Sequence, residues 1–579
     1  GKSFDEMYER FLYNYEIDIH KKFIEHLGNE FALIVTENPN VDNPYHYYAI
    51  IKAKDIATFK TLLEEELSTV PEEAFLAHRD SFAIRKLIPY QLLSACFGDV
   101  FSRLDSSYFT TINDYVVFGQ SPLSLELFIS GFLSGKTLNK NHNYLDFADN
   151  VAEEANFCFY ANIHKSFQLL VPIFNDKLKQ ELLKNEKSLK NIQAIAFQTT
   201  NQKSKFYFNA YLKHNAAYLE DSPSVWEFSA DTIISGKASV IDDFTDSTKK
   251  IVFFDALNNM YVLNRNGQLL WKKHINGAPL STVFSAFSHK NKNCYLIFNT
   301  KNHIYIFDTK GNKHNISPVK LPNPASTAIT IVDYSNNGDY RIIIPCENQI
   351  IYNFTFNGKP TPGWHNFRTN ARLNTPVEYF RLKKKDALIA TDVNGKVYFI
   401  DRRGKLLIKS SKPFIKAKNS IFYLVSDNNK QYLMTTDRKG KMIFVSENGS
   451  IEVVSTKNFS ENHYFVFGDF NLDTKNDFIF FDNNQVVVYN HAKRKIHEAS
   501  MTQIPCSKPR LLKIGKHKYY IVFPDSASAS IVLFNNKISK TLTGSPTIGR
   551  EFEISMFYGH NLYNILVSDS SKMMNFILN

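Results

Sequence analysis

The residues whose spacing is most specific for chemistry lie in the segment 469–477, which reads Asp-Phe-Asn-Leu-Asp-Thr-Lys-Asn-Asp. Asp469, Asn471, Asp473 and Asp477 place side-chain oxygens at positions 1, 3, 5 and 9 of one loop. Ca²⁺ is a hard cation that binds several oxygen ligands, so this spacing predicts a calcium-binding loop. Thr474 stands where such loops usually carry a glycine. An Asx-rich turn that stabilises itself is therefore the alternative interpretation.

The rest of the chain shows no other motif that carries chemistry. The 17 histidines fall in no nucleophile or metal motif, and the five cysteines have neither disulfide nor metal spacing. No phosphate-binding or dinucleotide-binding glycine pattern is present. We therefore expect no catalytic residues, no enzyme activity and no cofactor other than calcium. Trp364, in the loop 361–364, is a candidate for surface recognition.

The loop 469–477 and Trp364 lie within a sequence repeat that starts near residue 240, and this repeat must position them. In each copy an apolar strand ends at a marker residue, usually Asp or Asn, and a tight turn and a second strand follow. A period of this length with this strand content is typical of a four-stranded propeller blade. We expect the polar markers to bond the backbone of the following turn. The markers are Asp255, Asn299, Cys346, Asp392, Asp437, Asp482, Asp525 and Asp569, which lie 43 to 47 residues apart.

The two ends of the repeat array indicate how it closes. The last copy lacks an outer strand, and the segment 225–230 before the first copy resembles the missing strand. Pairing this segment with the C-terminal strands would remove two exposed sheet edges. The sequence thus predicts an all-β propeller over 225–579 with eight blades. Seven blades are the alternative if the third copy is not a full blade.

The first 215 residues follow a different pattern, which predicts an α+β domain. Ser121 and Pro122 form a typical helix start, with a capping hydroxyl and a proline at the first position. Strand–helix–strand pieces occur twice, which is consistent with an internal duplication. The polar stretch 216–224 is the predicted linker. Helices are expected over 4–27, 55–67, 122–135 and 164–184, and strands near 31–35, 47–51, 115–118, 157–160, 191–199 and 204–212.

Charge and hydropathy limit the kinds of partner that this chain is expected to bind. The net charge is +11, but the basic residues are dispersed, which favours a basic surface over a nucleic-acid interface. No apolar run is long enough to span a membrane. The chain begins on Gly1 directly before an amphipathic helix. We therefore expect that an export leader or membrane anchor was removed, and that any membrane attachment is through that anchor.

Two resemblances add to this interpretation. The segments 48–55, 113–119 and 156–162 resemble a bacterial family known as domain of unknown function 3352, which implies an exported, often membrane-anchored protein without catalytic residues. The segment 266–272 resembles the quinoprotein-type repeat of eight-bladed propellers. Quinoprotein dehydrogenases usually carry adjacent cysteines, which this chain lacks. The resemblance therefore favours the non-enzymatic members.

Together these observations predict a non-enzymatic protein of the periplasm or cell envelope that acts as a scaffold. The propeller loops would bind a protein partner. A module that binds a small ligand or a glycan at the propeller mouth is the first alternative. A divergent enzyme is the second.

Overall fold

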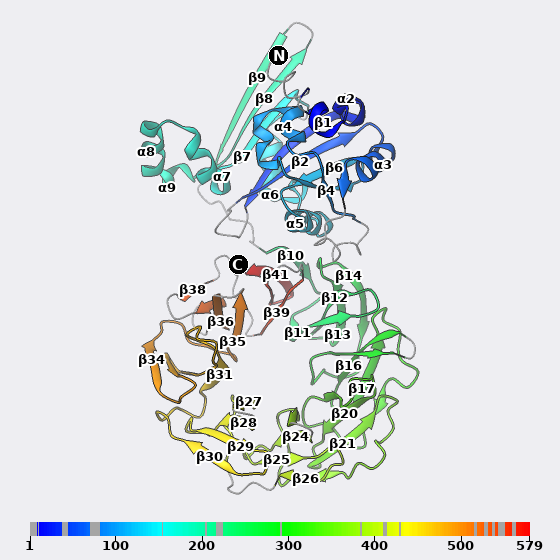
Figure 1. Cartoon of the computed structure of the whole chain (residues 1–579), viewed down its shortest axis with the longest axis vertical. Helices are drawn as coiled ribbons and strands as arrows, with labels where there is room; N and C mark the ends of the chain where they lie inside the picture. Colours follow the sequence, from blue (N-terminus) through cyan, green and yellow to red (C-terminus); the bar gives the residue numbers. More distant parts are fainter. Residues whose placement is uncertain are drawn as a thin grey trace. The chain divides into compact units, whose positions relative to one another are not determined.

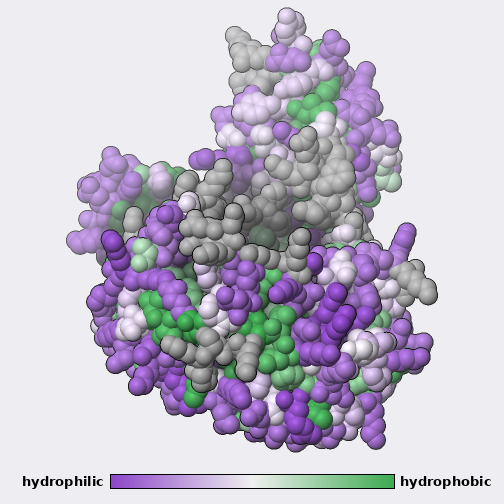
Figure 2. Space-filling view, turned by 60° about the horizontal axis from the view of Figure 1, so that its bottom comes forward, coloured by the Kyte–Doolittle hydropathy of each residue, from purple (hydrophilic) through white to green (hydrophobic). Residues whose placement is uncertain are grey.

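The structure is a computed structural model that consists of two compact units, Gly1–Trp226 and Glu227–Asn579 (Figure 1). It describes residues 9, 11–37, 45–69, 82–152, 154–202, 205–215, 224–289, 292–382, 385–408, 414–427, 430–514, 518–525, 531–534, 539–541, 551–557 and 563–578. The face shown in Figure 2 is largely hydrophilic and carries several apolar patches.

A six-stranded antiparallel sheet with the order β1-β2-β6-β5-β4-β3 is the centre of the first unit. Because side chains alternate along a strand, β2 and β6 contribute to two cores. One face packs Phe118 against Phe23 and Phe59, and the other packs Val117 against Leu125. The strands are β1 (Leu27–Glu37), β2 (Tyr45–Ala53), β3 (Ser68–Thr69), β4 (Arg85–Leu87), β5 (Tyr108–Ile112) and β6 (Tyr115–Gly119).

Helices cover both faces of this sheet. Helix α5 (Pro122–Leu133) begins as the sequence predicts, because the Ser121 hydroxyl accepts a hydrogen bond from the Ser124 backbone and Pro122 occupies the first turn. The other helical segments are α2 (Ile19–Lys22), η1 (Ile24–His26), α3 (Ile56–Glu66), α4 (Leu92–Phe97), η3 (Asp99–Leu104), η4 (Leu138–Lys140) and α6 (His142–Ala148).

The single helix predicted over 4–27 is wrong. The described residues are helical at 11–15, and the chain then turns at Glu16, whose φ is 54°. Asp18 starts a new helix, α2, by accepting a hydrogen bond from the Lys21 backbone. A capping side chain inside an amphipathic pattern thus divides the segment into two helices.

A second sheet, with the order β7-β8-β9, ends the first unit. Strand β7 (Phe157–Asn162) pairs with β8 (Ile192–Gln202), and β8 forms a long hairpin with β9 (Lys205–His214) (Figure 1). Between β7 and β8, the helix predicted over 164–184 is broken into α7 (Ile163–Leu170), η5 (Val171–Ile173) and α8 (Asp176–Lys184), and α9 (Glu186–Leu189) follows. Pro172 removes a helix donor and Asn175 caps α8, which explains the break.

In the second unit, the described strands form eight four-stranded sheets. Four of them are β11–β14 (Ile234–Asp243, Thr248–Asp255, Asn259–Asn264, Leu269–His274), β15–β18 (Phe284–Ser288, Asn293–Asn299, His303–Asp308, Val319–Lys320), β19–β22 (Thr330–Asp333, Tyr340–Pro345, Ile350–Thr355, Phe367–Arg368) and β23–β26 (Glu378–Leu382, Lys385–Thr391, Val397–Ile400, Leu406–Ile408). The others are β27–β30 (Tyr423–Asp427, Lys430–Thr436, Met442–Ser446, Ile451–Val454), β31–β34 (Tyr464–Gly468, Asp477–Asp482, Gln485–Tyr489, Lys495–Ser500), β35–β38 (Arg510–Ile514, Lys518–Pro524, Ile531–Phe534, Ser539–Thr541), and β10 (Trp226–Ser229) with β39–β41 (Phe552–Ser555, Tyr563–Asp569, Lys572–Leu578).

These sheets are arranged as the blades of a β-propeller. The first strands of neighbouring sheets touch: β11 contacts β15 and β39, β19 contacts β23, and β31 contacts β35. The first strands therefore line the centre, and the later strands lie further out (Figure 1). Apolar clusters join adjacent sheets, as where Val252 and Phe254 pack with Phe298.

Three of the strand-end markers have the structural role that the sequence predicts, whereas Asp482 and Asp525 instead accept backbone N–H groups of Ser460 and Ile504, about 20 residues earlier in the chain. Asp255 ends β12, and its carboxylate accepts hydrogen bonds from the Leu257 and Asn259 backbone N–H groups at 3.0 and 2.8 Å. Asp392 and Asp437 bond the backbone two and four residues further on in the same way. An acidic side chain at this position thus fixes the turn to the next strand.

Candidate functional site

A pocket of about 660 Å³ opens on the inner strands of the propeller. Its apolar lining includes Tyr423 of β27, Phe467 of β31 and Phe552 of β39. Lys508 and Arg510, at the start of β35, add two cationic groups, and Glu551 adds one carboxylate. The pocket therefore combines aromatic surface with positive charge at the centre of the ring.

Lys508 is the cation of this pocket that is left without an acidic partner. Among the described residues, its ammonium group forms no ion pair and lies over the Tyr423 ring, 5.9 Å from the centroid. Burial lowers the pKa of Lys508 to about 8, and Arg510 contributes in the same direction, whereas Glu378 opposes the shift. The side chain is thus poised to gain a negative partner.

Arg510, by contrast, is already neutralised by Glu553. Its guanidinium donates to the Glu553 carboxylate at 2.7 Å, and Lys237 of β11 forms an ion pair with the same carboxylate. Burial raises the pKa of Glu553, but the two cations outweigh burial and hold the pKa below its ordinary value. These three residues come from three different inner strands, so their ion pairs link the last two sheets of the chain to the sheet β11–β14.

A second charged group consists of Glu378, on the inner strand β23, and Lys416, which lies between β26 and β27. Glu378, the first residue of β23, accepts a hydrogen bond from the Phe422 backbone at 3.1 Å. Burial raises the pKa of Glu378, and Lys416 and Lys508 moderate the rise. Lys416 is 6% exposed and donates to the Ser420 carbonyl. The centre of the propeller is thus lined by a network of charges in which cations are slightly in excess.

The lowered pKa of Lys508 predicts its chemical reactivity. We expect acylation of Lys508 to rise to half its maximal rate near pH 8, because the neutral amine is the reactive form. Glu378→Gln should move this midpoint to lower pH, since Glu378 opposes the shift. Mass spectrometry of the labelled peptide across pH measures both. A midpoint near about pH 10, as for a free lysine, would contradict the assignment.

The predicted calcium loop lies between β31 and β32, and its own backbone uses most of its oxygens. Both carboxylate oxygens of Asp469 accept N–H groups, from Asp473 and Thr474 at 3.0 Å each. The Asn471 side-chain oxygen accepts the Asp473 N–H, and an Asp473 oxygen accepts the Lys475 N–H. These bonds are those of the alternative interpretation, a self-stabilised Asx-rich turn.

Asp477 differs from the other three side chains of this loop. One of its oxygens accepts the Phe470 and Asn471 N–H groups, and the other is buried without a hydrogen-bond partner. Burial raises the pKa of Asp477, and Asp473 and Asp469 add to the rise. This oxygen is the one feature of the loop that fits an added cation.

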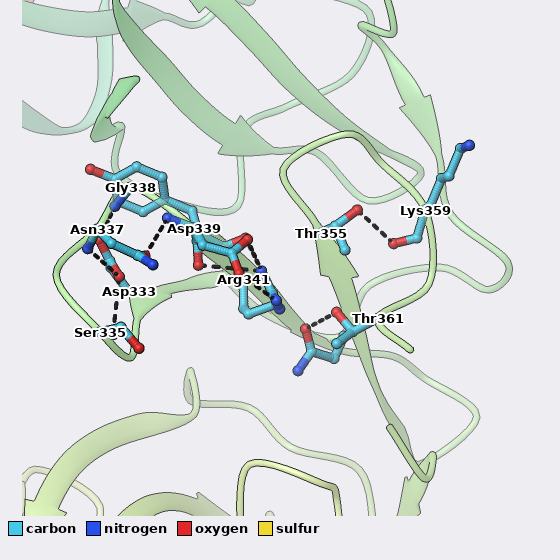
Figure 3. A network of polar contacts seen from close by, with 11 residues as sticks. Asp333, Ser335, Asn337, Gly338, Asp339, Arg341, Thr355, Lys359 and Thr361 are labelled. Carbon is cyan, nitrogen blue, oxygen red and sulfur yellow. Dashed lines mark hydrogen bonds and ion pairs between the residues drawn. The ribbon is translucent and has the colours of Figure 1, made fainter. Parts of the chain in front are cut away.

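In the equivalent loops of two other sheets, a basic side chain occupies the position that Asp477 has in this loop. Lys250 occupies that position near the start of β12 and binds Asp246 at 2.7 Å, and Arg341 occupies it near the start of β20 and binds Asp339 (Figure 3). Asp333, like Asp469, accepts backbone N–H groups around its loop (Figure 3). The turn is therefore stable without a metal in these two blades.

Within the described ranges, no three His, Cys, Asp or Glu side chains gather in a group that could hold a metal ion. Calcium binding by Asp469, Asn471, Asp473 and Asp477 accordingly stays a prediction. The hydrogen bonds of the loop favour the structural interpretation.

Trp364, the predicted recognition residue, is half-buried. Its indole N–H donates to the Ile351 carbonyl at 3.1 Å, and its ring packs beside Phe367 and Leu373. These contacts favour a packing role over recognition. No pattern in the sequence marks Lys508, because a single lysine before a strand is unremarkable until the inner strands are known.

The sequence matches no protein-family model and no curated protein. Its structure is similar to BBS1N in complex with ARL6DN (10% identity, TM-score 0.38, 61% of this chain and 95% of that chain). It is also similar to BamB from Moraxella catarrhalis (12%, 0.39, 61% and 96%) and to Saccharomyces cerevisiae Sqt1 (8%, 0.43, 62% and 100%).

All three are β-propeller proteins. At these identities and TM-scores the likeness carries no argument about function, and the propeller assignment rests on the strand pairing itself. The resemblance of the first unit to domain of unknown function 3352 stays a prediction, since no family model matches. Among the described helices, none is both long and apolar enough to cross a membrane.

Proposed function

We propose that this protein is a non-catalytic scaffold whose propeller binds a partner protein through the Lys508 pocket and the loops around it. In this proposal the eight sheets are eight blades, and β10 beside β41 closes the ring. The observation that carries the proposal is Lys508, which forms no ion pair among the described residues and lies in a pocket lined by aromatic rings and one carboxylate, that of Glu551.

The pocket chemistry favours an acidic segment of the partner. A carboxylate of that segment would pair with Lys508, whose ammonium is partly desolvated and therefore interacts strongly with a negative charge. Tyr423, Phe467 and Phe552 offer apolar surface for a neighbouring side chain. Aromatic and cationic residues are the groups that contribute most to protein–protein recognition.

The test uses a fluorescent peptide of glutamate and leucine residues and the full chain. We expect anisotropy to report binding to the wild type and a loss of about tenfold in affinity for Lys508→Met, which retains much of the side-chain bulk. Lys439→Met, at an exposed turn, is the matched control and should bind as the wild type does. Equal binding by the Lys508 and Lys439 variants would refute the site.

The pH dependence gives a second measure of the same site. The pKa of Lys508 is lowered to about 8, so its charge is present below that pH and is lost above it. Peptide affinity should therefore fall as pH rises through about 8. The Lys508→Met variant should not show this fall. A fall of the same size in the variant would assign the pH dependence to other groups.

A small ligand or glycan is the second candidate, favoured by the size of the pocket, since about 660 Å³ is within the range of small-molecule sites. The peptide experiment distinguishes a small ligand or glycan from a protein partner. A simple carboxylate or an oligosaccharide that displaces the peptide completely at low concentration would favour the small ligand. A peptide whose affinity grows with its length would favour a protein partner.

We also propose a location in the cell envelope, with attachment through an N-terminal anchor. Support for this comes from the resemblance of the first unit alone. The absence of enzyme activity is likewise part of the proposal. It is supported by the lack of a recognisable catalytic motif in the sequence.

A further inference from the structure

The three-stranded sheet of the first unit has one face that is apolar and exposed. Side chains two residues apart point to the same face of a strand, and cross-strand partners share a face. Phe159 pairs with Phe197, and Phe157 and Phe208 both pair with Thr199. The Phe197 and Phe208 rings lie 6.2 Å apart, which confirms that they share a face. We call this surface the aromatic face, and it consists of Phe157, Phe159, Phe197, Phe206, Phe208 and Leu212.

The two faces of this sheet differ in how much of each is covered by other elements. The opposite face carries Ala194, Ala196 and Tyr211, which pack against Phe147 of α6. On the aromatic face, helix α7 packs only at the base, against Ile192 and Ile195. The remainder is uncovered: Phe206 and Phe208 are 69% and 70% exposed. Contiguous exposed apolar surface of this kind marks an interaction site.

The segment that contains the aromatic face is basic, and helices α8 and α9 lie beside the base of this face, since Leu182 and Leu189 pack with Ile192 and Ile195. The segment 157–214 contains nine lysines and three acidic residues, which is a net charge of +6. This segment is about a tenth of the chain, whose total net charge is +11. Within the described residues, five of these lysines form no ion pair; they are Lys177, Lys179, Lys184, Lys187 and Lys205. Helix α8 adds the exposed Leu178 and Leu183 between them.

Aromatic side chains flanked by unpaired lysines fit the surface of an anionic lipid bilayer. The rings can enter the headgroup region, and each lysine near the surface is attracted by the negative lipids. A second copy of this chain is a poorer fit, because pairing two such surfaces would bring like charges together. We propose that the aromatic face and helices α8 and α9 form a peripheral binding surface for an anionic membrane.

This proposal is independent of the pocket in the propeller, and it would add a second membrane contact to any N-terminal anchor. The test is sedimentation of the full chain with vesicles of phosphatidylglycerol and phosphatidylcholine, compared with vesicles of phosphatidylcholine alone. We expect binding to the anionic vesicles, weakened by salt. The Phe206→Ser, Phe208→Ser double variant should bind about tenfold less, because it removes apolar area that enters the membrane.

Tyr207→Ser is the matched control, since Tyr207 is also half-exposed but lies on the opposite face of β9. It should bind as the wild type does. Lys184→Glu with Lys187→Glu should reduce binding to anionic vesicles only. Unchanged thermal unfolding of each variant shows that it has folded.

A second measurement does not depend on loss of binding. Phe206→Trp should show a fluorescence shift to shorter wavelength with anionic vesicles and quenching by brominated lipid, whereas Tyr207→Trp should show neither. Equal binding to both kinds of vesicle, or equal loss in the Phe206/Phe208 and Tyr207 variants, would overturn the proposal. So would concentration-dependent dimerisation through these phenylalanines without vesicle binding, which would assign the face to a second copy.

Discussion

Asp255→Ala should destabilise the propeller by about 3 kcal/mol and lower its melting temperature by about 5 °C. Asp255 is fully buried, and its carboxylate accepts four hydrogen bonds: the Leu257 and Asn259 backbone N–H groups, the Asn259 side chain and the Tyr261 hydroxyl. Alanine would leave the buried Tyr261 hydroxyl and the partly buried N–H groups without this acceptor, and each such group costs free energy. Denaturant unfolding of the full chain, followed by the transition of the propeller, measures the loss.

Asp308→Ala is the matched control for this prediction. Asp308 accepts three of the four corresponding bonds, from the Lys310 and Asn312 backbones and the Asn312 side chain, but at the surface. Water can replace the carboxylate there, so the loss should be about 1 kcal/mol. Equal losses for the two variants would show that burial does not set the cost.

The same network predicts an acid dependence. Burial raises the pKa of Asp255, but the four hydrogen bonds outweigh burial and hold the pKa below its ordinary value. A lowered pKa means that the unfolded chain binds the proton more readily than the folded protein. The stabilisation is therefore present above about pH 4 and is lost as pH falls through the folded pKa. Asp255→Ala should flatten the pH–stability curve in this range.

Glu553→Ala has the second large expected effect, a destabilisation of about 3 kcal/mol. The substitution would leave Lys237 and Arg510 facing each other in the centre of the ring without the carboxylate that neutralises both. The penalty arises from two partly buried like charges, so it should be relieved by a second substitution, Lys237→Met. A double-mutant cycle measured by denaturant unfolding tests this coupling.

Glu498→Ala is the contrasting control. Lys457 and Lys495 lower the pKa of Glu498 to about 2, yet the group is exposed. Solvent screens such a surface ion pair, and its removal should leave stability almost unchanged. A larger loss of stability for Glu498→Ala than for Glu553→Ala would show that the shift in pKa, and not burial, determines how much an ion pair stabilises the fold.

The residues that position the candidate site could be predicted in part. The strand-end acids were recognisable because a turn is a local structure, and a carboxylate that bonds N–H groups two and four residues away needs no distant partner. The break at Pro172 and the cap at Asp18 are also local signals, but an amphipathic pattern that continues across them hides the ends of the helices. The loop 469–477 was located from its spacing, whereas the hydrogen bonds that occupy its oxygens depend on the fold.

The sequence by itself determined the repeat: apolar strands, polar strand ends and turns at a period of 43 to 47 residues, and hence a sheet-rich second unit distinct from the first. These features recur locally, so they can be read along the chain. Only the tertiary structure decided which charges meet. Lys237, Glu378, Lys508 and Glu553 are separated by tens to hundreds of residues and converge because the first strand of each sheet lines the same axis. The exposed phenylalanines of the first unit are a second example, because the pairing register of β7, β8 and β9 places them on one uncovered face.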